Sequence, residues 1–522
     1  MSKGIRDMKQ WINGMYLTGA ATLAAVVIGL GCSPETEQPL NIILFMVDDM
    51  GWQDTSVPFW KERTRFNELY HTPNMERLAA EGMIFTQAYA CAVCSPTRTS
   101  LMTGMNAARH GVTNWTLGRD SSQDGADDIL KMPAWNVNGL QAVDTINHSV
   151  YATTLAQLLN ENGYFTIHCG KAHWGAMNTP GENPLNLGFD INIAGHAAGG
   201  LGSYQGERNF GNAEIGGHTR PWGVPGLEKY HGEPINLTDA LTLEAMAALD
   251  KARETGKPFY LYMSHYTVHT PLEPDHRYIQ KYRDMGLDER EARYASMLEG
   301  MDQSLGELME YLDLHGLTDH TVILFMSDNG GLSASNRGGA SHTHNFPLNS
   351  GKGSAYEGGI RVPMIVRWPG RVAPGSADED YLIIEDFFPS ILEIAGVETF
   401  NTVQDVDGVS FVPRLLREGT ADAERNLVFH YPNKWGLSGP GIGTTSTIRS
   451  GDWKLIYWYK DQHVELYNIP EDIGENNNLA AQHPEKVDEL ATELGSYLRT
   501  VNALRPTFKA TGEPVPWPDE IN

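Results

Sequence analysis

The sequence predicts an α/β sandwich, in which helices flank a large, mostly parallel central sheet, followed by a small antiparallel sheet with one helix. Two observations lead to this prediction. Short continuous apolar runs, typical of strands buried on both faces of a parallel sheet, alternate with segments of helical spacing. Polar residues directly follow several of these runs, and ligands of open α/β sheets gather at the carboxyl ends of strands. We therefore expect a functional site along that edge.

Five apolar runs predict strands of the large sheet. The clearest run, residues 40–47 (LNIILFMV), ends at two aspartates. Comparable runs occupy residues 164–168, 259–263, 322–326 and 364–366. The polar groups that follow four of the runs are Asp48 and Asp49, Lys171 and His173, the segment 265–269, and Asp328 and Asn329.

Helices are predicted between these strands. Thr72 is expected to cap a helix whose first residue is Pro73, and Gly82 is expected to end it. Segments 152–162 and 289–315 carry Leu and Met at helical spacing, so each is predicted to be a helix.

After about residue 421 the pattern of long apolar runs and helical segments gives way to shorter segments. Short strands with turn residues between them are predicted at 426–431, 444–449, 453–459 and 464–467, and a helix at 484–501. We therefore expect a catalytic α/β domain at residues 40–420 and a C-terminal α+β subdomain at 421–522. Segments 117–150 and 196–235 are long for simple connections and are expected to line a cleft.

Composition excludes several classes of protein. The 522 residues include 39 Lys+Arg and 65 Asp+Glu, a formal charge of −26, so we expect no nucleic-acid partner. A chain that is 41% hydrophobic and 20% charged is globular rather than disordered. Four cysteines are too few for a disulfide scaffold. Because an acidic surface repels anions, a site for an anionic substrate must gather its cations locally.

The N-terminus is predicted to be an export signal. Lys3, Arg6 and Lys9 precede an uncharged apolar run at residues 17–31, which is short for a membrane span. The sequence Gly31-Cys32-Ser33 resembles the cleavage box of bacterial lipoproteins, so residues 1–31 are predicted to be removed and Cys32 lipidated, with 32–39 as a linker. We expect an exported protein, periplasmic or at the cell surface of a bacterium. Secretion without a lipid anchor is the alternative.

Residues 94–98 (Cys-Ser-Pro-Thr-Arg) form a C-x-P-x-R motif that chance produces seldom in a chain of this length. Pro96 suits the first turn of a helix, so Cys94 is expected at a helix N-terminus, where free N–H groups favour an anion. The two acidic pairs after strands offer only oxygen ligands, which suit a hard cation such as Ca²⁺ or Mg²⁺.

With these residues the chain resembles the type I, formylglycine-dependent sulfatases of the alkaline-phosphatase superfamily, in particular bacterial carbohydrate sulfatases. The resemblance covers residues 40 to about 500 and implies an alkaline-phosphatase-like sandwich. It implies that a maturation enzyme oxidises Cys94 to formylglycine (3-oxoalanine). The metal ligands that it implies are Asp48, Asp49, Cys94, Asp328 and Asn329, with Ca²⁺ as the expected ion and Mg²⁺ as the alternative. The catalytic residues that it implies are Cys94, Arg98, Lys171, His173, His269 and Lys352.

The resemblance also implies a reaction. Hydrated formylglycine 94 attacks the sulfur of a sulfate ester, His269 with Lys352 protonates the leaving alcohol, and His173 accepts a proton so that inorganic sulfate is released. Lys171, His269, Lys352 and His196 are expected to contact the substrate. We expect a sulfated saccharide as substrate, because the chain carries an export signal and long Gly- and Trp-containing insertions.

Some alternatives stay open at this point. A phosphonate or phosphodiester hydrolase of the same superfamily would share the nucleophile and metal, and a noncatalytic lipoprotein that binds sulfated glycans would share the fold. Cys91 and Cys94 form a C-x-x-C pair that exported proteins also use for redox chemistry. Cys91 and Cys169 either pair or remain buried thiols. Other histidines considered for substrate contact are His265, His342, His344 and His430, whereas Glu357 and Arg361 are expected to shape the loop after Lys352.

Overall fold

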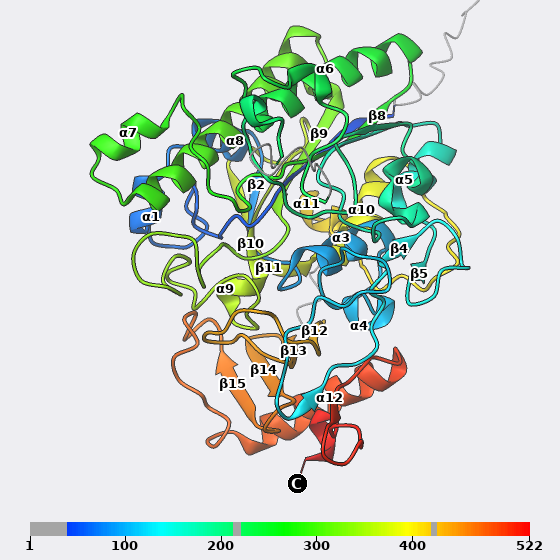
Figure 1. Ribbon diagram of the computed structural model, residues 1–522, viewed down its shortest axis with the longest axis vertical. Coiled ribbons are helices and arrows are strands. Elements are labelled where there is room, and N and C mark those ends of the chain that lie inside the picture. The colour runs from blue at the N-terminus through cyan, green and yellow to red at the C-terminus, as the bar shows by residue number, and fades with distance from the viewer. Residues whose placement is uncertain (1–38, 212–220, 419–424, 522) are drawn as a thin grey trace, which may run out of the picture. The chain divides into compact units, whose positions relative to one another are not determined.

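An eight-stranded sheet organises most of the chain in the computed structural model, which describes residues 39–211, 221–418 and 425–521 (Figure 1). The order of its strands is β11-β2-β10-β9-β1-β8-β6-β7. Their bounds are β1 (Asn41–Val47), β2 (Met83–Tyr89), β6 (Phe165–Gly170), β7 (Ile191–Ile193), β8 (Phe259–Ser264), β9 (Thr321–Ser327), β10 (Arg361–Arg367) and β11 (Ser376–Ile383). The export signal, Cys32 and most of the predicted linker lie outside the described residues.

The sheet is mostly parallel, as predicted. The central strand β1 pairs in parallel with β8 on one side and β9 on the other, and every residue of β1 is buried. Residues 364–366 do form a strand, but β10 runs antiparallel to β9 and β2. The chain between β9 and β10 stays at the carboxyl edge of the sheet, so β10 starts there and runs back. The sequence did not indicate this reversal.

Helices cover both faces of the sheet, which makes the predicted sandwich (Figure 1). Alternate residues of β1 enter two cores: Phe45 packs with α6 and α8 on one face, and Leu44 packs with α5 and α10 on the other. The helices are α1 (Arg65–Leu69), α2 (Pro73–Glu81), α3 (Cys94–Thr103), α4 (Ala107–His110), α5 (Leu155–Glu161), α6 (Leu237–Thr255), α7 (Ile279–Asp284), α8 (Glu289–Leu314), α9 (Glu357–Ile360), α10 (Phe387–Ile394), α11 (Val412–Leu415) and α12 (Pro484–Thr500).

The helix after Thr72 has the predicted bounds for different reasons. The hydroxyl of Thr72 makes no capping bond and instead bonds the hydroxyls of Thr55 and Ser56. Gly82 follows the helix with φ −133°, which any residue adopts. A Cβ at this position would lie 2.5 Å from the carbonyl oxygen of Val366, so glycine is needed for close packing against β10.

The small antiparallel sheet is also present, with strand order β12-β13-β14-β15. Its strands are β12 (Leu427–Tyr431), β13 (Thr445–Ser450), β14 (Trp453–Trp458) and β15 (Val464–Asn468). Helix α12 packs Leu490, Leu494 and Leu498 against this sheet (Figure 1). The predicted boundary at 420/421 falls in residues 419–424, which are not described. Of the helices in the described ranges, none combines the length and the apolar character that a bilayer crossing needs.

Short elements fill the connections. The two-residue strands are β3 (Leu130–Lys131), β4 (Leu140–Gln141), β5 (Val150–Tyr151) and β16 (Thr507–Phe508). Single 3₁₀ turns lie at Pro180–Glu182, Pro184–Leu187, Gly206–Arg208, Glu228–Tyr230, Thr318–His320, Ile384–Asp386 and Pro518–Glu520.

Candidate active site

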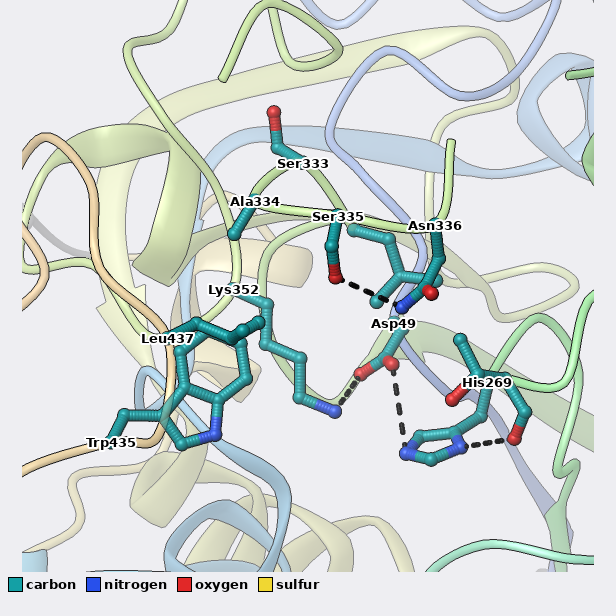
Figure 2. A pocket seen from close by; sticks show the side chains of 11 residues that line it. Asp49, His269, Ser333, Ala334, Ser335, Asn336, Lys352, Trp435 and Leu437 are labelled. Carbon is teal, nitrogen blue, oxygen red and sulfur yellow. Dashed lines mark hydrogen bonds and ion pairs between the residues drawn. The ribbon is translucent and has the colours of Figure 1, made fainter. Parts of the chain in front are cut away.

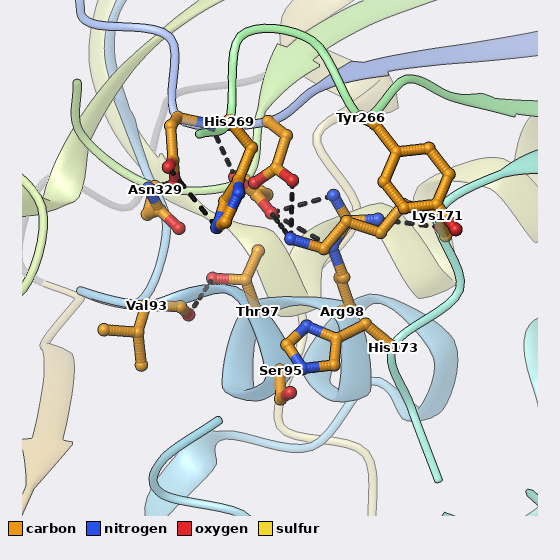
Figure 3. A network of polar contacts seen from close by, with 12 residues as sticks. Val93, Ser95, Thr97, Arg98, Lys171, His173, Tyr266, His269 and Asn329 are labelled. Atoms are coloured by element: carbon orange, nitrogen blue, oxygen red, sulfur yellow. Dashed lines mark hydrogen bonds and ion pairs between the residues drawn. The ribbon is translucent and has the colours of Figure 1, made fainter. Parts of the chain in front are cut away.

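Four neighbouring strands bring the predicted polar groups together. In the order β9-β1-β8-β6 the carboxyl ends of the strands lie side by side, because these four strands are parallel. Asp328, Asp48 and Lys171 follow β9, β1 and β6, respectively. Helix α3 reaches this edge and adds Arg98 from its second turn (Figure 3). Segments up to 280 residues apart in the sequence thus meet at one place.

Asp48, Asp49 and Asp328 form a buried cluster in which one carboxylate oxygen of each residue lies within 4.8 Å of the other two. Each of three neighbouring side chains leaves one buried oxygen without a hydrogen-bond partner: Oδ1 of Asp48, Oδ2 of Asp49 and Oδ1 of Asn329. Buried oxygens without a donor are costly unless something binds them. This all-oxygen set fits a hard divalent cation such as Ca²⁺ or Mg²⁺.

Three cationic side chains compensate the three carboxylates. Nζ of Lys171 donates to Oδ2 of Asp48 at 2.5 Å, and Nζ of Lys352 donates to Oδ1 of Asp49 at 2.6 Å. Each lysine therefore occupies one carboxylate oxygen and leaves the other oxygen unpartnered. With Arg98 on Asp328, the cluster is neutral in charge. A divalent cation added to it would make the site positive and suited to an anionic ester.

Arg98 fixes the geometry of Asp328. Its Nε and Nη2 donate to Oδ2 of Asp328 at 3.0 and 2.8 Å, and Nη1 donates to the hydroxyl of Ser264 at 2.6 Å and to the carbonyl of Lys171. The side chains of Arg98 and Asp328 are fully buried. Although burial raises it, the pKa of Asp328 falls below its ordinary value because of Arg98 and Lys171.

Cys94 is the first residue of α3, as the motif predicted, and only 4% of it is exposed. The charged groups that act on its thiol are Lys171 and Lys352, which favour the thiolate, and Asp328 and Asp48, which oppose it. Burial outweighs the lysines and raises the pKa of the thiol above its ordinary value. The unmodified side chain is thus a poor nucleophile that faces the acidic cluster.

Two histidines present one unprotonated nitrogen each. Nε2 of His173 donates to the carbonyl of Thr116 at 2.8 Å, and Nδ1 has no partner among the described residues. Nδ1 of His269 donates to the carbonyl of Thr270 at 2.8 Å, and Nε2 lies 3.8 Å from Oδ2 of Asp49. Burial and the nearby lysines lower the pKa of both rings, that of His269 to about 3. Both imidazoles are therefore neutral at neutral pH.

Glycines let the chain approach these two rings. A Cβ at Gly199 would lie 2.2 Å from the His173 ring, and one at Gly200 would lie 3.2 Å from the His269 ring. Both glycines belong to the segment 196–235 that was expected to line a cleft. Gly199 and Gly200 therefore pack against the two rings, which leave no room for a side chain at Gly199 and little at Gly200.

Lys352 is positioned by backbone bonds on both sides of it. Its own N–H donates to the carbonyl of Gly331, which follows β9, and the N–H of Gly353 donates to the carbonyl of Ala92, just before α3. The loop therefore connects the segment after β9 to the start of α3. After this loop, Glu357 forms buried ion pairs with Arg361 and with Lys454.

A pocket of ≈ 220 Å³ opens beside this cluster. Asp49, His269 and Lys352 form its polar base, and Trp435 and Leu437 lie beside Lys352 on one side (Figure 2). The rest of its lining is Thr270, Leu332, Ser333, Ala334, Ser335 and Asn336. Sequence reasoning missed Trp435, Leu437 and the serine-rich rim. The only indication was an apolar pair inside a Gly-rich turn, which many loops contain.

Other candidate histidines have structural partners. His265 and His430 are buried and bonded, to Ser304 and to Ser446 with the Leu504 carbonyl, respectively. His344 bonds Ser333 and the carbonyl of Gly338. His196 is buried, its carbonyl accepts from the N–H of His173, and it is absent from the described residues that line the pocket. His342 packs under Gly439 and leaves Nδ1 without a partner among the described atoms.

The three cysteines of the described residues are all free thiols. Cys91 and Cys169 are therefore not paired with each other, and Cys91 forms no bond with Cys94. Cys169 lies in β6 and donates to the carbonyl of Leu241. Its burial raises its pKa, as expected of a structural thiol.

The site combines buried carboxylates, lysines and histidines at the carboxyl edge of an α/β sheet, and comparison with known proteins gives its family. The Sulfatase family model matches residues 40–397, and the model for the N-sulphoglucosamine sulphohydrolase C-terminal region matches 351–503. The chain belongs to the sulfatase family, and it is a sulfuric ester hydrolase.

Relatives match over most of their length. A "Sulfatase" of Formosa agariphila is 29% identical over 94% of this chain and 96% of its own. The N-acetylgalactosamine-6-sulfatase of Homo sapiens is 31% identical over 77% of this chain and 70% of its own. The crystal structure of Ps i-CgsB in complex with k-i-k-neocarrahexaose shares 27% identity and a TM-score of 0.69, covering 88% of this chain and 93% of that chain.

Proposed function

We propose that this sulfatase hydrolyses sulfate esters of a carbohydrate through formylglycine at residue 94 and a divalent cation, Ca²⁺ in preference to Mg²⁺. The observation that carries the proposal is the set of unpartnered buried oxygens of Asp48, Asp49 and Asn329 beside Cys94. Asp48, Asp49, Asp328 and Asn329 would hold the cation, together with residue 94. When bound, the cation would offset the ester's negative charge and lower the pKa of a hydroxyl on residue 94.

The chain's own residues provide the remaining chemistry. Lys171 and Lys352 would contact the sulfate oxygens, and the N-terminus of α3 would add its free N–H groups. Oxidised and hydrated, residue 94 would supply one hydroxyl to attack sulfur and a second whose deprotonation releases sulfate. Nδ1 of His173 has no partner among the described residues, so we assign it to accept that proton.

His269, with Lys352, is assigned to protonate the leaving alcohol. The ring is neutral as the structure stands, because burial and Lys352 lower its pKa. A bound sulfate ester adds a negative charge that opposes Lys352 and raises the pKa of the ring. Nε2 of His269 points into the pocket toward Asp49, so a proton held there faces the ester (Figure 2). Arg98 touches no substrate in this scheme and holds Asp328 in place.

A carbohydrate is proposed as substrate because two relatives act on or bind one by name. The human relative is an N-acetylgalactosamine-6-sulfatase, and the crystallised relative holds k-i-k-neocarrahexaose. The polar and apolar lining of the pocket suits a sugar, since hydroxyl, amide and aromatic groups surround one opening.

The test is a release assay joined to mass spectrometry. The protein is produced with and without a formylglycine-generating enzyme, and residue 94 is identified as thiol or aldehyde by peptide mass. We expect sulfate from N-acetylgalactosamine 6-sulfate or k-i-k-neocarrahexaose only from the aldehyde form, and none from Cys94→Ala. Equal turnover by Cys94→Ala would reject the mechanism. Release of the aryl alcohol from an aryl phosphodiester, with no sulfate from any sugar, would favour the phosphonate or phosphodiester hydrolase.

We also propose that the protein is exported and anchored by a lipid on Cys32. The proposal is supported by the pattern of charge and hydropathy in the sequence of residues 1–33. These residues lie outside the part of the chain that the structure describes. Fractionation of bacteria that express the chain tests it. We expect the wild type in the membrane fraction and Cys32→Ser outside it; an equal distribution of both would exclude the anchor.

A further inference from the structure

The side of the pocket next to Lys352 is apolar, although the base of the pocket is charged. Trp435 and Leu437 both line it, and 41% of Leu437 is exposed. Figure 2 shows the two side chains on one side of Lys352 and His269 on the far side of Asp49. Exposed apolar groups that adjoin a charged site indicate a ligand with an apolar face.

The indole of Trp435 is held against the loop that carries Lys352. A Cβ at Gly353 would lie 2.2 Å from Cε3 of Trp435, so the ring rests directly on the backbone of the residue after Lys352. The φ of Gly353 is +84°, which also favours glycine. The position of the ring is thus tied to the position of the Lys352 ammonium.

A second contact fixes the backbone of Trp435 from the other side. The N–H of Gly125 donates to the carbonyl of Lys434 at 2.7 Å, and Nδ2 of Asn433 donates to Asp124 at 2.9 Å. These partners belong to the segment 117–150, which lines no part of the pocket among the described residues. The long insertion therefore acts as a support for Trp435, and the ring is preorganised before any ligand binds.

We propose that Trp435, with Leu437, is the platform on which the sugar ring carrying the reacting sulfate stacks. The proposal rests on the carbohydrate sulfatase function proposed above and adds a specificity-determining residue to it. A pyranose has an apolar face of C–H groups and a rim of hydroxyls. The apolar face matches Trp435 and Leu437. The rim of hydroxyls matches Ser333, Ser335 and Asn336 across the opening. The ester then points from the ring toward Lys352 and His269.

The Trp435 platform should distinguish sulfated sugars from sulfate esters that have no ring. A sulfate ester without a ring gains nothing from Trp435, whereas a sulfated sugar gains the stacking contact in the bound state. The pair should therefore act mainly on KM for saccharides. It should not affect the binding of inorganic sulfate, which needs only the charged base of the pocket.

The experiment uses the full chain with aldehyde at residue 94 and compares the wild type with Trp435→Ala and Trp435→Phe. For the saccharide that the wild type turns over, either N-acetylgalactosamine 6-sulfate or k-i-k-neocarrahexaose, we expect Trp435→Ala to raise KM about tenfold or more, because buried aromatic anchors carry much of a binding energy. Trp435→Phe keeps an aromatic ring at this position, so its KM should be close to that of the wild type. The inhibition constant of inorganic sulfate should change less than about twofold, within the spread of a near-neutral contact.

The control is Trp453→Ala. Trp453 begins β14 at the end of the small sheet opposite the pocket, where it contacts His483. This variant loses the same kind of side chain and should keep the wild-type KM. The melting temperature of each variant is measured to check that the fold is kept.

A binding measurement separates failure of this proposal from failure of the proposed function. Both saccharides are titrated calorimetrically into Cys94→Ala and into Cys94→Ala with Trp435→Ala. Weaker binding by the double variant supports the platform even if no sulfate is released, in which case the carbohydrate sulfatase function fails alone. An unchanged KM or an unchanged dissociation constant in the Trp435→Ala background overturns the platform, and so does the absence of saccharide binding by Cys94→Ala.

Discussion

The ammonium group of Lys171 lies 2.5 Å from one carboxylate oxygen of Asp48, and the other oxygen of the same carboxylate has no partner among the described residues. Asp49 repeats this arrangement with Lys352. Each aspartate thus has one oxygen in an ion pair and one oxygen free to accept a ligand. A cation could then use the free oxygens without breaking either ion pair.

Calcium should stabilise the protein. At free Ca²⁺ one hundred times the dissociation constant, the folded state gains about 2.7 kcal/mol, and the melting temperature should rise by a few degrees relative to protein with chelator. Asp49→Asn should remove the shift, because it weakens the ligand set, whereas Asp461→Asn at an exposed carboxylate should keep it. Differential scanning calorimetry gives the comparison. An identical melting temperature in calcium and in chelator would contradict the metal site.

Arg98→Ala should be strongly destabilising. It leaves the buried carboxylate of Asp328 without its main partner, and breaking a buried pair from one side costs about 3–5 kcal/mol. The matched control is Arg77→Ala, whose partner Asp313 is 44% exposed and whose loss should cost at most about 1 kcal/mol. Urea denaturation measures both. Equal losses in the two variants would show that Asp328 does not depend on Arg98.

The stability of the fold should fall between about pH 4.5 and 8 because of Glu385. Burial and the neighbouring Asp386 raise the pKa of this carboxyl to about 8; Oε1 accepts from Asn106, and Oε2 has no partner among the described residues. Because the pKa of Glu385 is higher in the folded protein than in the unfolded chain, its protonated carboxyl contributes fully to the free energy of unfolding below pH 4.5. This contribution is lost as the pH rises through 8.

Glu385→Gln should flatten this dependence, because it cannot ionise. Melting temperatures of wild type and variant between pH 5 and 9 give the measurement. Parallel curves for the two proteins would show that Glu385 is already charged in the folded state.

Gly353→Ala should destabilise the protein more than Gly370→Ala. Both residues have positive φ, +84° and +73°, so each substitution costs about 1–2 kcal/mol of backbone strain. A Cβ at Gly370 meets no atom within 4 Å, whereas one at Gly353 meets the ring of Trp435. The difference between the two free energies of unfolding isolates that contact. A smaller loss at Gly353 would mean that Trp435 moves aside freely.

The sequence predicted the carboxyl edge of the sheet because that information is local. An apolar run and the polar residues after it, such as residues 40–47 and Asp48, identify a strand and its end within ten residues. Parallel pairing then brings Asp328 beside Asp49 without further information. The small sheet was predicted equally well, because its strands alternate with clear turn residues.

Features that depend on distant contacts were not predictable. The direction of β10 depends on where the chain emerges after the Lys352 loop. The edge strand β11 is acidic and largely exposed, so its sequence (SADEDYLI) lacks the apolar run of a central strand. Trp435 belongs to the pocket only because Gly353 and the segment at Gly125 hold it there.

The burial of Cys94 has a consequence for timing. In the folded protein the residue begins a helix and only 4% of it is exposed to solvent. If Cys94 is oxidised as proposed above, the maturation enzyme would therefore have to meet it in a chain that is not yet folded. Oxidation would then come first and folding second, and a chain that folds too early would stay permanently inactive.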